Sequence, residues 1–577
     1  MTDESFNILI GGEAGQGLAT IGHILSKILV RAGYSIVSSQ TYESRIRGGH
    51  NTFAVRFSPG AVHAPTEAID ILVALNEETV SLHEESLSLQ GVVVVNQSER
   101  EGNSPHIAVP MKDLADGRHI NSVALGVVGA IVGLEEDLAR GVLKDYLDGA
   151  AEEVVKSNVK SLREGYRWLS EQSRTLPRVP GPSDRERRLT LNGNEAIALG
   201  ALAAGLKFYS FYPMSPSTSI AVALIHHAQA MNLVVEQAED EIAALNMAIG
   251  AAFAGAPSMV ATSGGGFALM NEAVSLAAAA EIPVVIVVAQ RAGPATGLPT
   301  RTAQGDLEFV LHSGHGEFPR ALLTPGTVEE CFHLTRKAFE MAQAYHGPVF
   351  LLTDQFLADS YHDVPRFGLD DVPTVRTCAE SEGEPGESGE AFLSYKVTEN
   401  GVSPRLLPGL TSRCSAGYSS EQLVVGDSHE HSEDGQITED LSVRKVMVEK
   451  RLRKTEVLKE RIVPPQRGGD DNAEVLLVCW GSTKGAVAEA ASVLSGNGRS
   501  AAWMHFPQVW PMNPAKIRKQ LEAAKNVVCV EENATGQFAR LLRRETGFHI
   551  EDRVLRYDGL PVTPECIVRE LAENGKG

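Results

Sequence analysis

Long apolar runs are absent from this chain of 577 residues. No stretch reaches the roughly 18 consecutive apolar residues that mark a membrane-spanning helix, so we expect no membrane segment. The opening residues, MTDESFNILIGG, also lack the basic region and apolar core of a secretory signal. These absences predict a cytoplasmic protein.

Cysteine is scarce: the six residues of this type are scattered, and no CxxC pair occurs. Scattered thiols in a large cytoplasmic chain argue against a disulfide framework. Without closely spaced cysteines, the chain also has no obvious ligand set for zinc or an iron–sulfur cluster. The sequence therefore predicts that this chain holds no metal of its own.

Positive charge is in deficit, with 52 lysines and arginines against 73 acidic residues and a net charge of −21. This balance argues against a nucleic-acid partner, because phosphate binding needs clustered basic residues. Hydrophobic residues make up 43% of the chain, which is ordinary for a globular protein. Because the chain is too long for a single core, we expect several domains.

Alternating buried strands and helices predict a multidomain α/β fold. Residues 1–171 form the first expected domain, opening with a strand, a glycine turn and a helix (NILIGGEAGQGLATIGHILSKILVRAG). Residues 172–190 are charged and contain prolines, so we expect a linker there. A second α/β domain spans 191–365, an extended linker region with one helix spans 366–472, and a third α/β domain spans 473–577.

The second domain carries several motifs in a fixed order. They are GNEA from Gly193, YPMSPST at 212–218, EQAEDE at 236–241, TSGGGFALMNE at 262–272 and QRAGPATGLPTRTAQGDL at 290–307. Together they resemble the pyrimidine-binding domain of the thiamine-diphosphate-dependent 2-oxoacid:ferredoxin oxidoreductases. Ser215 stands where that family commonly has threonine, and Ala295 stands where serine is common.

The resemblance extends over nearly the whole chain. The first domain, with GGEAGQG and YESRIRGG, looks like the γ domain of the family, and the third, with WGSTKGAVAEA and VEENATGQFARLLR, looks like its transketolase-C-like domain. A γ domain fused ahead of α is most similar to the 2-oxoglutarate enzymes. The resemblance implies oxidative decarboxylation of a 2-oxoacid to an acyl-CoA and CO₂, with electrons passed to ferredoxin.

The sequence leaves other hypotheses for the substrate and the function open. The substrate could instead be pyruvate, a branched-chain 2-oxoacid or a broad range of 2-oxoacids, and the chain could be a non-catalytic paralogue that only binds a partner. GGEAGQG could indicate a dinucleotide-binding reductase, although it lacks the full GxGxxG fingerprint.

The missing GDG motif limits what this chain does alone. In thiamine enzymes that motif holds Mg²⁺ and the diphosphate, and it does not occur in the sequence. The resemblance therefore implies that thiamine diphosphate is shared with a separate β subunit, which carries Mg²⁺ and a [4Fe–4S] cluster. We expect two γα chains and two β chains, coenzyme A as co-substrate, and no activity without β.

Glu241 is the candidate catalytic residue, because the resemblance implies a glutamate that hydrogen-bonds N1′ of the aminopyrimidine and so activates the cofactor. Glu236 and Glu239 are competitors, and Glu241 could simply be a first-turn glutamate favoured by the helix dipole. Tyr212 and Pro213 are expected beside the cofactor.

Ser215 and Arg301 are the candidate substrate-binding residues. A guanidinium matches a carboxylate bidentately, so Arg301 would grip the 1-carboxylate, while the Ser215 hydroxyl would bond the substrate's carboxylate or keto oxygen. The alternatives are a surface arginine and a helix N-cap. Arg45 and Arg47 could meet a distal carboxylate or form salt bridges between domains, and the role of GGEAGQG stays open between a ligand cradle and a tight turn.

Overall fold

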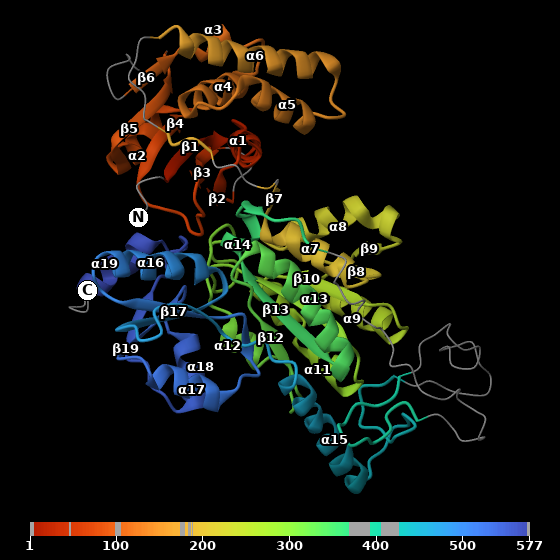
Figure 1. Ribbon diagram of the computed structural model, residues 1–577. Coiled ribbons are helices and arrows are strands. Elements are labelled where there is room, and N and C mark those ends of the chain that lie inside the picture. The colour runs from red at the N-terminus through yellow and green to blue at the C-terminus, as the bar shows by residue number, and fades with distance from the viewer. Residues whose placement is uncertain are drawn as a thin grey trace.

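The computed structural model describes residues 5–44, 48–97, 106–172, 179–182, 186, 188–368, 393–405 and 426–573. Arg45 and Arg47 lie outside these residues. The described residues form three sheets with helices packed on them, one sheet for each part of the chain (Figure 1). The predicted multidomain α/β class is confirmed. Among the described helices, none combines the length and the apolar character needed to cross a membrane.

The first sheet is mixed and has the order β6-β5-β4-β1-β3-β2-β14-β7. Its strands are β1 (Phe6–Ala14), β2 (Ser35–Thr41), β3 (Gly48–Ser58), β4 (Ile69–Ala74), β5 (Leu87–Asn96), β6 (His106–Val109), β7 (Leu189–Leu191) and β14 (His362–Val364). Its helices are α1 (Leu18–Ala32), α2 (Glu77–His83), α3 (Met111–Leu114), α4 (Ile120–Val132), α5 (Glu136–Tyr146) and α6 (Glu152–Ser170).

The second sheet has the order β18-β12-β13-β11-β10-β8-β9 and is parallel apart from β18. Its strands are β8 (Phe208–Phe211), β9 (Val234–Gln237), β10 (Ser258–Thr262), β11 (Val284–Gln290), β12 (Ala321–Leu323), β13 (Pro348–Asp354) and β18 (Gln508–Trp510). Its helices are α7 (Gly193–Ala203), α8 (Thr218–Met231), α9 (Glu241–Phe253), α10 (Gly264–Leu269), α11 (Asn271–Ala279), α12 (Leu307–Leu311), α13 (Val328–Tyr345) and α14 (Gln355–Asp359).

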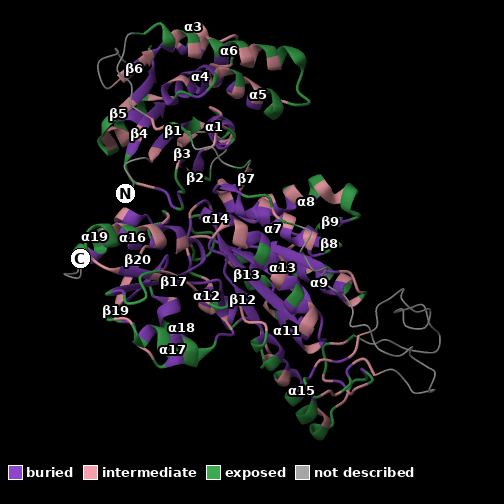
Figure 2. Ribbon diagram, in the orientation of Figure 1, coloured by how far each residue is buried: buried purple, intermediate pink, exposed green. Residues whose placement is uncertain are grey.

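Burial on both faces explains the apolar strands of this sheet. In β11, Ile286 and Val288 join one hydrophobic cluster and Val285 and Val287 join another, so every side chain of the strand is covered. The strands at the centre of this sheet are accordingly buried throughout (Figure 2).

The third sheet, ordered β15-β17-β16-β19-β20, is parallel except for β15. Its strands are β15 (Gln466–Gly469), β16 (Val475–Trp480), β17 (Ala501–Phe506), β19 (Asn526–Glu531) and β20 (Asp552–Leu555), and its helices are α16 (Lys484–Gly496), α17 (Pro514–Glu522), α18 (Gln537–Thr546) and α19 (Pro564–Glu573). Trp480 and Phe506 of this unit share one hydrophobic cluster with Leu322 and Phe350 of the second. The two units therefore pack as a single body.

Strands cross between the units. β7 and β14, which flank the second unit in sequence, add to the edge of the first sheet beside β2. The Asp363 carboxylate in β14 accepts hydrogen bonds from the Ser35 hydroxyl at 2.7 Å and the Ile36 amide at 2.9 Å. These bonds fix the first unit against the second.

A buried ion cluster anchors α15 (Leu441–Lys459), which projects below the second unit (Figure 1). Glu281 pairs with Lys450 at 2.5 Å and also with Lys454, and all three side chains are almost wholly buried. Burial alone would raise the pKa of Glu281, but the two ammonium groups overcome it and hold that pKa at about 2.

Glycines let two helices of the first unit touch. A Cβ added at Gly165 of α6 would lie 2.5 Å from the carbonyl oxygen of Val123 in α4, whereas a Cβ at Gly141 of α5 would meet nothing within 4 Å. We expect Gly165→Ala to lower the free energy of unfolding by about 1–3 kcal/mol through overpacking. Gly141→Ala should raise it by about 0.5–1 kcal/mol through helix propensity. Urea denaturation followed by circular dichroism tests this pair; equal effects would contradict the close crossing.

Candidate active site

The sequence motifs meet at the carboxyl edge of the second sheet. YPMSPST follows β8, EQAEDE runs through the end of β9, TSGGG follows β10 and QRAG follows β11. Because these strands are parallel neighbours, their carboxyl ends lie side by side. Segments far apart in sequence therefore form one site.

Glu241 is a buried carboxylate at this edge. It is the first residue of α9, and the Asp240 side chain caps that helix by accepting a hydrogen bond from the Ala243 amide at 2.7 Å. The Glu241 residue is 4% exposed, whereas its competitors Glu236 and Glu239 are exposed. Of the three acidic candidates, only Glu241 is held inside the protein.

A glycine makes room for the Glu241 side chain. A Cβ added at Gly266 of α10 would lie 2.6 Å from Oε1 of Glu241 and would also collide with the Thr262 hydroxyl. The glycine run after β10 therefore lets the backbone approach the carboxylate closely.

Arg291 is a residue of the site that sequence reasoning missed. It directly follows β11, and its Nη1 donates a hydrogen bond of 2.8 Å to the carbonyl oxygen of Ser215. Asp306 lies close enough to interact with Arg291; burial raises the pKa of Asp306 to about 6, and the arginine charge opposes that rise. The sequence signal that could have identified Arg291 is its place as a charged residue directly after the apolar run of β11.

The Ser215 side chain is not the helix cap. Ser217 occupies the N-cap position of α8, and its hydroxyl donates to the carbonyl oxygen of Met214 at 2.8 Å. Ser215, Tyr212 and Pro213 are exposed on the same turn. The turn thus presents these three residues outward.

Arg301 lies where all three units meet. Its neighbour Thr300 donates a hydrogen bond of 2.5 Å to the carbonyl oxygen of Tyr42, and Gly559 of the third unit packs against the Arg301 stem. Burial lowers the pKa of Arg301, and the charges of Glu43 and Asp558 oppose this. Arg301 is thus a half-buried residue, and Tyr42 is a neighbour that only the tertiary structure reveals.

Several large hydrophobic side chains are exposed on the elements that follow these strands. Those that are 38–63% exposed lie on the turn after β8 and on α8, α9 and α10: Tyr212, Val222, Ile225, Ile242, Met247 and Leu269. Helix α8 packs on one face of the second sheet, and α9 and α10 pack on the other, so these side chains lie on two sides of the unit.

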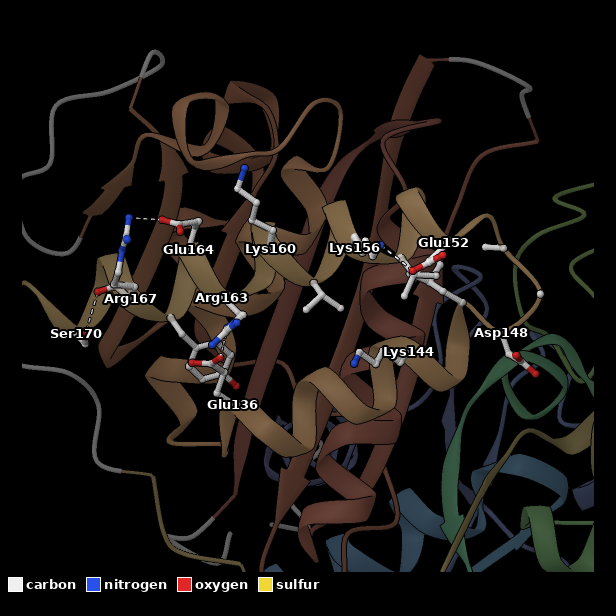
Figure 3. Close-up of a pocket in the computed structure, with 16 residues that line it drawn as sticks. Glu136, Lys144, Asp148, Glu152, Lys156, Lys160, Arg163, Glu164, Arg167 and Ser170 are labelled. Carbon is white, nitrogen blue, oxygen red and sulfur yellow. Dashed lines mark hydrogen bonds and ion pairs between the residues drawn. The ribbon is translucent and has the colours of Figure 1, made fainter.

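A separate cavity of about 1120 Å³ lies between α5 and α6, far along the first unit from these motifs (Figure 3). Its charged walls are largely paired with one another, as in Lys156–Glu152 at 2.7 Å and Arg163–Glu136 at 2.9 Å. Residues 136–170 line it, so it contains none of the motif residues.

The glycine turn GGEAGQG closes on itself. The Gln16 side chain accepts a hydrogen bond from the Glu13 amide at 2.7 Å, and Asn121 donates to the Gln16 carbonyl at 2.7 Å. Gly17 adopts φ 75°, a left-handed conformation that favours glycine.

Known proteins match this chain along its length. A domain described as pyruvate flavodoxin/ferredoxin oxidoreductase, thiamine diphosphate-binding, matches residues 199–410, and one described as pyruvate ferredoxin/flavodoxin oxidoreductase matches residues 7–168. The α subunit of 2-oxoacid:ferredoxin oxidoreductase 2 from Aeropyrum pernix is 32% identical, with 96% of this chain and 95% of the relative aligned. This chain belongs to the 2-oxoacid:ferredoxin oxidoreductase α-subunit family. The predicted family and enzyme class are confirmed.

Two further matches bear on the family. The 2-oxoglutarate synthase subunit KorA of Methanothermobacter marburgensis is 32% identical over 66% of this chain and 97% of its own length. The structure of 2-oxoglutarate:ferredoxin oxidoreductase from Magnetococcus marinus, with 2-oxoglutarate, coenzyme A and succinyl-CoA bound, has a TM-score of 0.89, 29% identity and 99% coverage of both chains. The Aeropyrum relative is named as an α subunit.

The close approach at Gly266 gives a test of the site. Gly266→Ala places a methyl group against the Glu241 carboxylate, so 2-oxoacid-dependent reduction by the assembled enzyme should fall by about 100-fold. Gly265→Ala is the matched control, since its Cβ would lie 3.9 Å from the nearest atom, the carbonyl oxygen of Ala295. Equal activity in the two variants would contradict the contact.

Proposed function

We propose that this chain supplies the pyrimidine-binding half of a thiamine diphosphate site in an enzyme that converts 2-oxoglutarate, coenzyme A and oxidised ferredoxin to succinyl-CoA, CO₂ and reduced ferredoxin. The buried Glu241 carboxylate, at the sheet edge where the sequence motifs meet, carries the proposal. The 2-oxoglutarate names of several relatives and the ligands of the Magnetococcus enzyme support this substrate.

The residues at this edge fit an aminopyrimidine. A carboxylate held in a site that excludes water can hold a proton shared with a ring nitrogen, which is the role we assign to Glu241. Gly266 leaves room beside the carboxylate that a larger side chain would fill, and Tyr212 and Pro213 are exposed on the turn after β8. When bound, thiamine diphosphate supplies the electron sink for loss of CO₂.

The substrate would be held by two groups from different loops. Arg301 offers a guanidinium fork for the 1-carboxylate, and the Ser215 hydroxyl faces outward from its turn to meet the carboxylate or keto oxygen. Arg291 fixes the Ser215 backbone and so positions that hydroxyl.

Exposed apolar side chains support a β partner. We propose that those of α8, α9 and α10 contact a β subunit that binds the diphosphate and Mg²⁺ and carries the [4Fe–4S] cluster, in an assembly of two γα and two β chains. Among the described residues, no cluster of three metal-ligating side chains occurs. We further propose a cytoplasmic location, with no nucleic-acid partner.

Reconstitution tests the substrate. The chain is co-purified with its β partner and assayed for methyl-viologen reduction with 2-oxoglutarate, pyruvate and branched-chain 2-oxoacids, with and without coenzyme A. We expect the highest kcat/KM with 2-oxoglutarate. A preference for pyruvate would reassign the substrate, and no reduction with any 2-oxoacid would reject the catalytic role.

Glu241 can be tested against its neighbours. Glu241→Gln keeps the size of the side chain but cannot carry the charge, so turnover should fall by about 10²–10⁴-fold while co-purification with β persists. Glu236→Gln and Glu239→Gln, at exposed positions, should keep nearly full turnover. Loss of activity in either control instead of Glu241→Gln would move the role to that residue.

Arg301→Lys keeps the charge but loses the fork. We expect KM for the 2-oxoacid to rise by about tenfold or more while kcat changes little. The reason is that the lost fork weakens binding of the ground state and of the transition state equally. Steady-state kinetics of the assembled enzyme measure this, and an unchanged KM would exclude Arg301 as the carboxylate ligand.

A further inference from the structure

Two carboxyl groups are buried together beside the Arg301 loop. Asp354 ends β13 in the second unit and is 1% exposed, and Glu532 follows β19 in the third unit and is 2% exposed. Thr302, itself 2% exposed, lies between them: its hydroxyl is 3.4 Å from Oε2 of Glu532 and also bonds to Asp354. One hydroxyl thus faces two carboxyl groups at a boundary between units.

The hydrogen bonds among Thr302, Asp354 and Glu532 require one proton more than the threonine hydroxyl supplies. A threonine hydroxyl has one proton to donate, so it cannot satisfy two carboxylates at once. Two ionised carboxylates in a buried site also repel each other, and one of them then takes up a proton. With one carboxyl protonated, that group donates to the threonine oxygen and the threonine donates to the other.

The surrounding donors decide which carboxyl keeps its charge. Burial raises the pKa of Asp354, and the hydrogen bonds that it accepts from the Leu357 amide at 3.0 Å and from Ser482 oppose this rise, because they favour the ionised form. Burial and the charge of Asp354 raise the pKa of Glu532 to about 8. Glu532 is therefore the protonated member at neutral pH.

Glu532 also connects the two loops between which Arg301 lies. Its carboxyl accepts a hydrogen bond from the Val562 amide at 2.8 Å, and its backbone exchanges hydrogen bonds of 2.7 and 3.0 Å with Gln304. The Thr302 amide donates to the Gly559 carbonyl oxygen at 3.2 Å, and Gly559 packs on the Arg301 stem. One side chain thus links the loop that carries Arg301 to the loop that covers it.

We propose that Glu532, protonated and bonded through Thr302 to ionised Asp354, is a positioning residue that sets Arg301 for binding the substrate carboxylate. The proposal rests on the role assigned to Arg301 above.

Other titratable groups face the pair and stay constant in the comparisons below. Arg556, on the loop after β20, faces Glu532, and the buried Cys331 thiol of α13 faces Asp354. The carboxylate of the neighbouring Glu531 points to the start of α18, where it accepts hydrogen bonds from the Phe538 and Ala539 amides at 2.8 and 3.0 Å.

Conservative and truncating variants of the assembled enzyme separate positioning from packing. In Glu532→Gln the amide can donate to Thr302 and accept from Val562, so KM should stay within about twofold of the unmodified enzyme. Glu532→Ala and Thr302→Val should each raise KM on the order of tenfold with kcat little changed. Equal KM increases in Glu532→Gln and Glu532→Ala, or none in Glu532→Ala, would overturn the proposal.

The thermal midpoint reports the proton itself. Because the pKa of Glu532 is raised on folding, its stabilising effect is present at low pH and is lost as the pH rises to about 8. The midpoint of the unmodified enzyme should therefore fall more between pH 6 and pH 8.5 than that of Glu532→Gln. Asp354→Asn should lower the midpoint at both pH values, because one carboxylate oxygen becomes an NH₂ group, a donor that faces the donors of Ser482. A parallel pH response in Glu532→Gln, or an undisturbed Asp354→Asn, would overturn the shared proton.

The two proposals fail in different ways. An unchanged KM in Arg301→Lys would remove the role of Arg301, and with it the positioning role of Glu532, while the thermal midpoints would still report the proton. A raised KM in Arg301→Lys with an unchanged KM in Glu532→Ala would overturn only the positioning role.

Discussion

The loop 299–304 must satisfy all three units at once, and the site depends on this constraint. Thr300 bonds to the first unit through Tyr42, Thr302 bonds to the third through Gly559, and the loop itself belongs to the second. Arg301 lies between these two residues, so its position cannot be set within any one unit. Shared strands fix the first unit against the second, and a shared hydrophobic core fixes the third, so the packing of the units sets this position.

The site at the carboxyl edge of the second sheet is built within one unit, unlike the loop that carries Arg301. Parallel strands buried on both faces bring four loops together, and the first turn of α9 carries Glu241 into the interior. Large apolar side chains of α8, α9 and α10 remain exposed. In the function proposed above, Glu241 belongs to one half of a site, and the sequence contains no GDG motif for the other half.

Buried charge is used twice at boundaries in this chain. Glu281 meets two lysines of α15, and its charge is matched by theirs. Asp354 and Glu532 instead have like charge, so their burial together requires a proton. The first arrangement anchors a projecting helix, while the second adjoins the loop that carries Arg301.

The sequence by itself determined the α/β class, the family and the motif order, because these follow from apolar periodicity and from contiguous residues. It also indicated Glu241, although three acidic residues competed and only burial separates them. The tertiary structure alone decided that Arg291 holds Ser215, that Tyr42 lies beside Arg301 and that Glu532 faces Asp354. Glu532 and Asp354 are far apart in sequence, and no local pattern encodes which loops meet when separate sheets pack together.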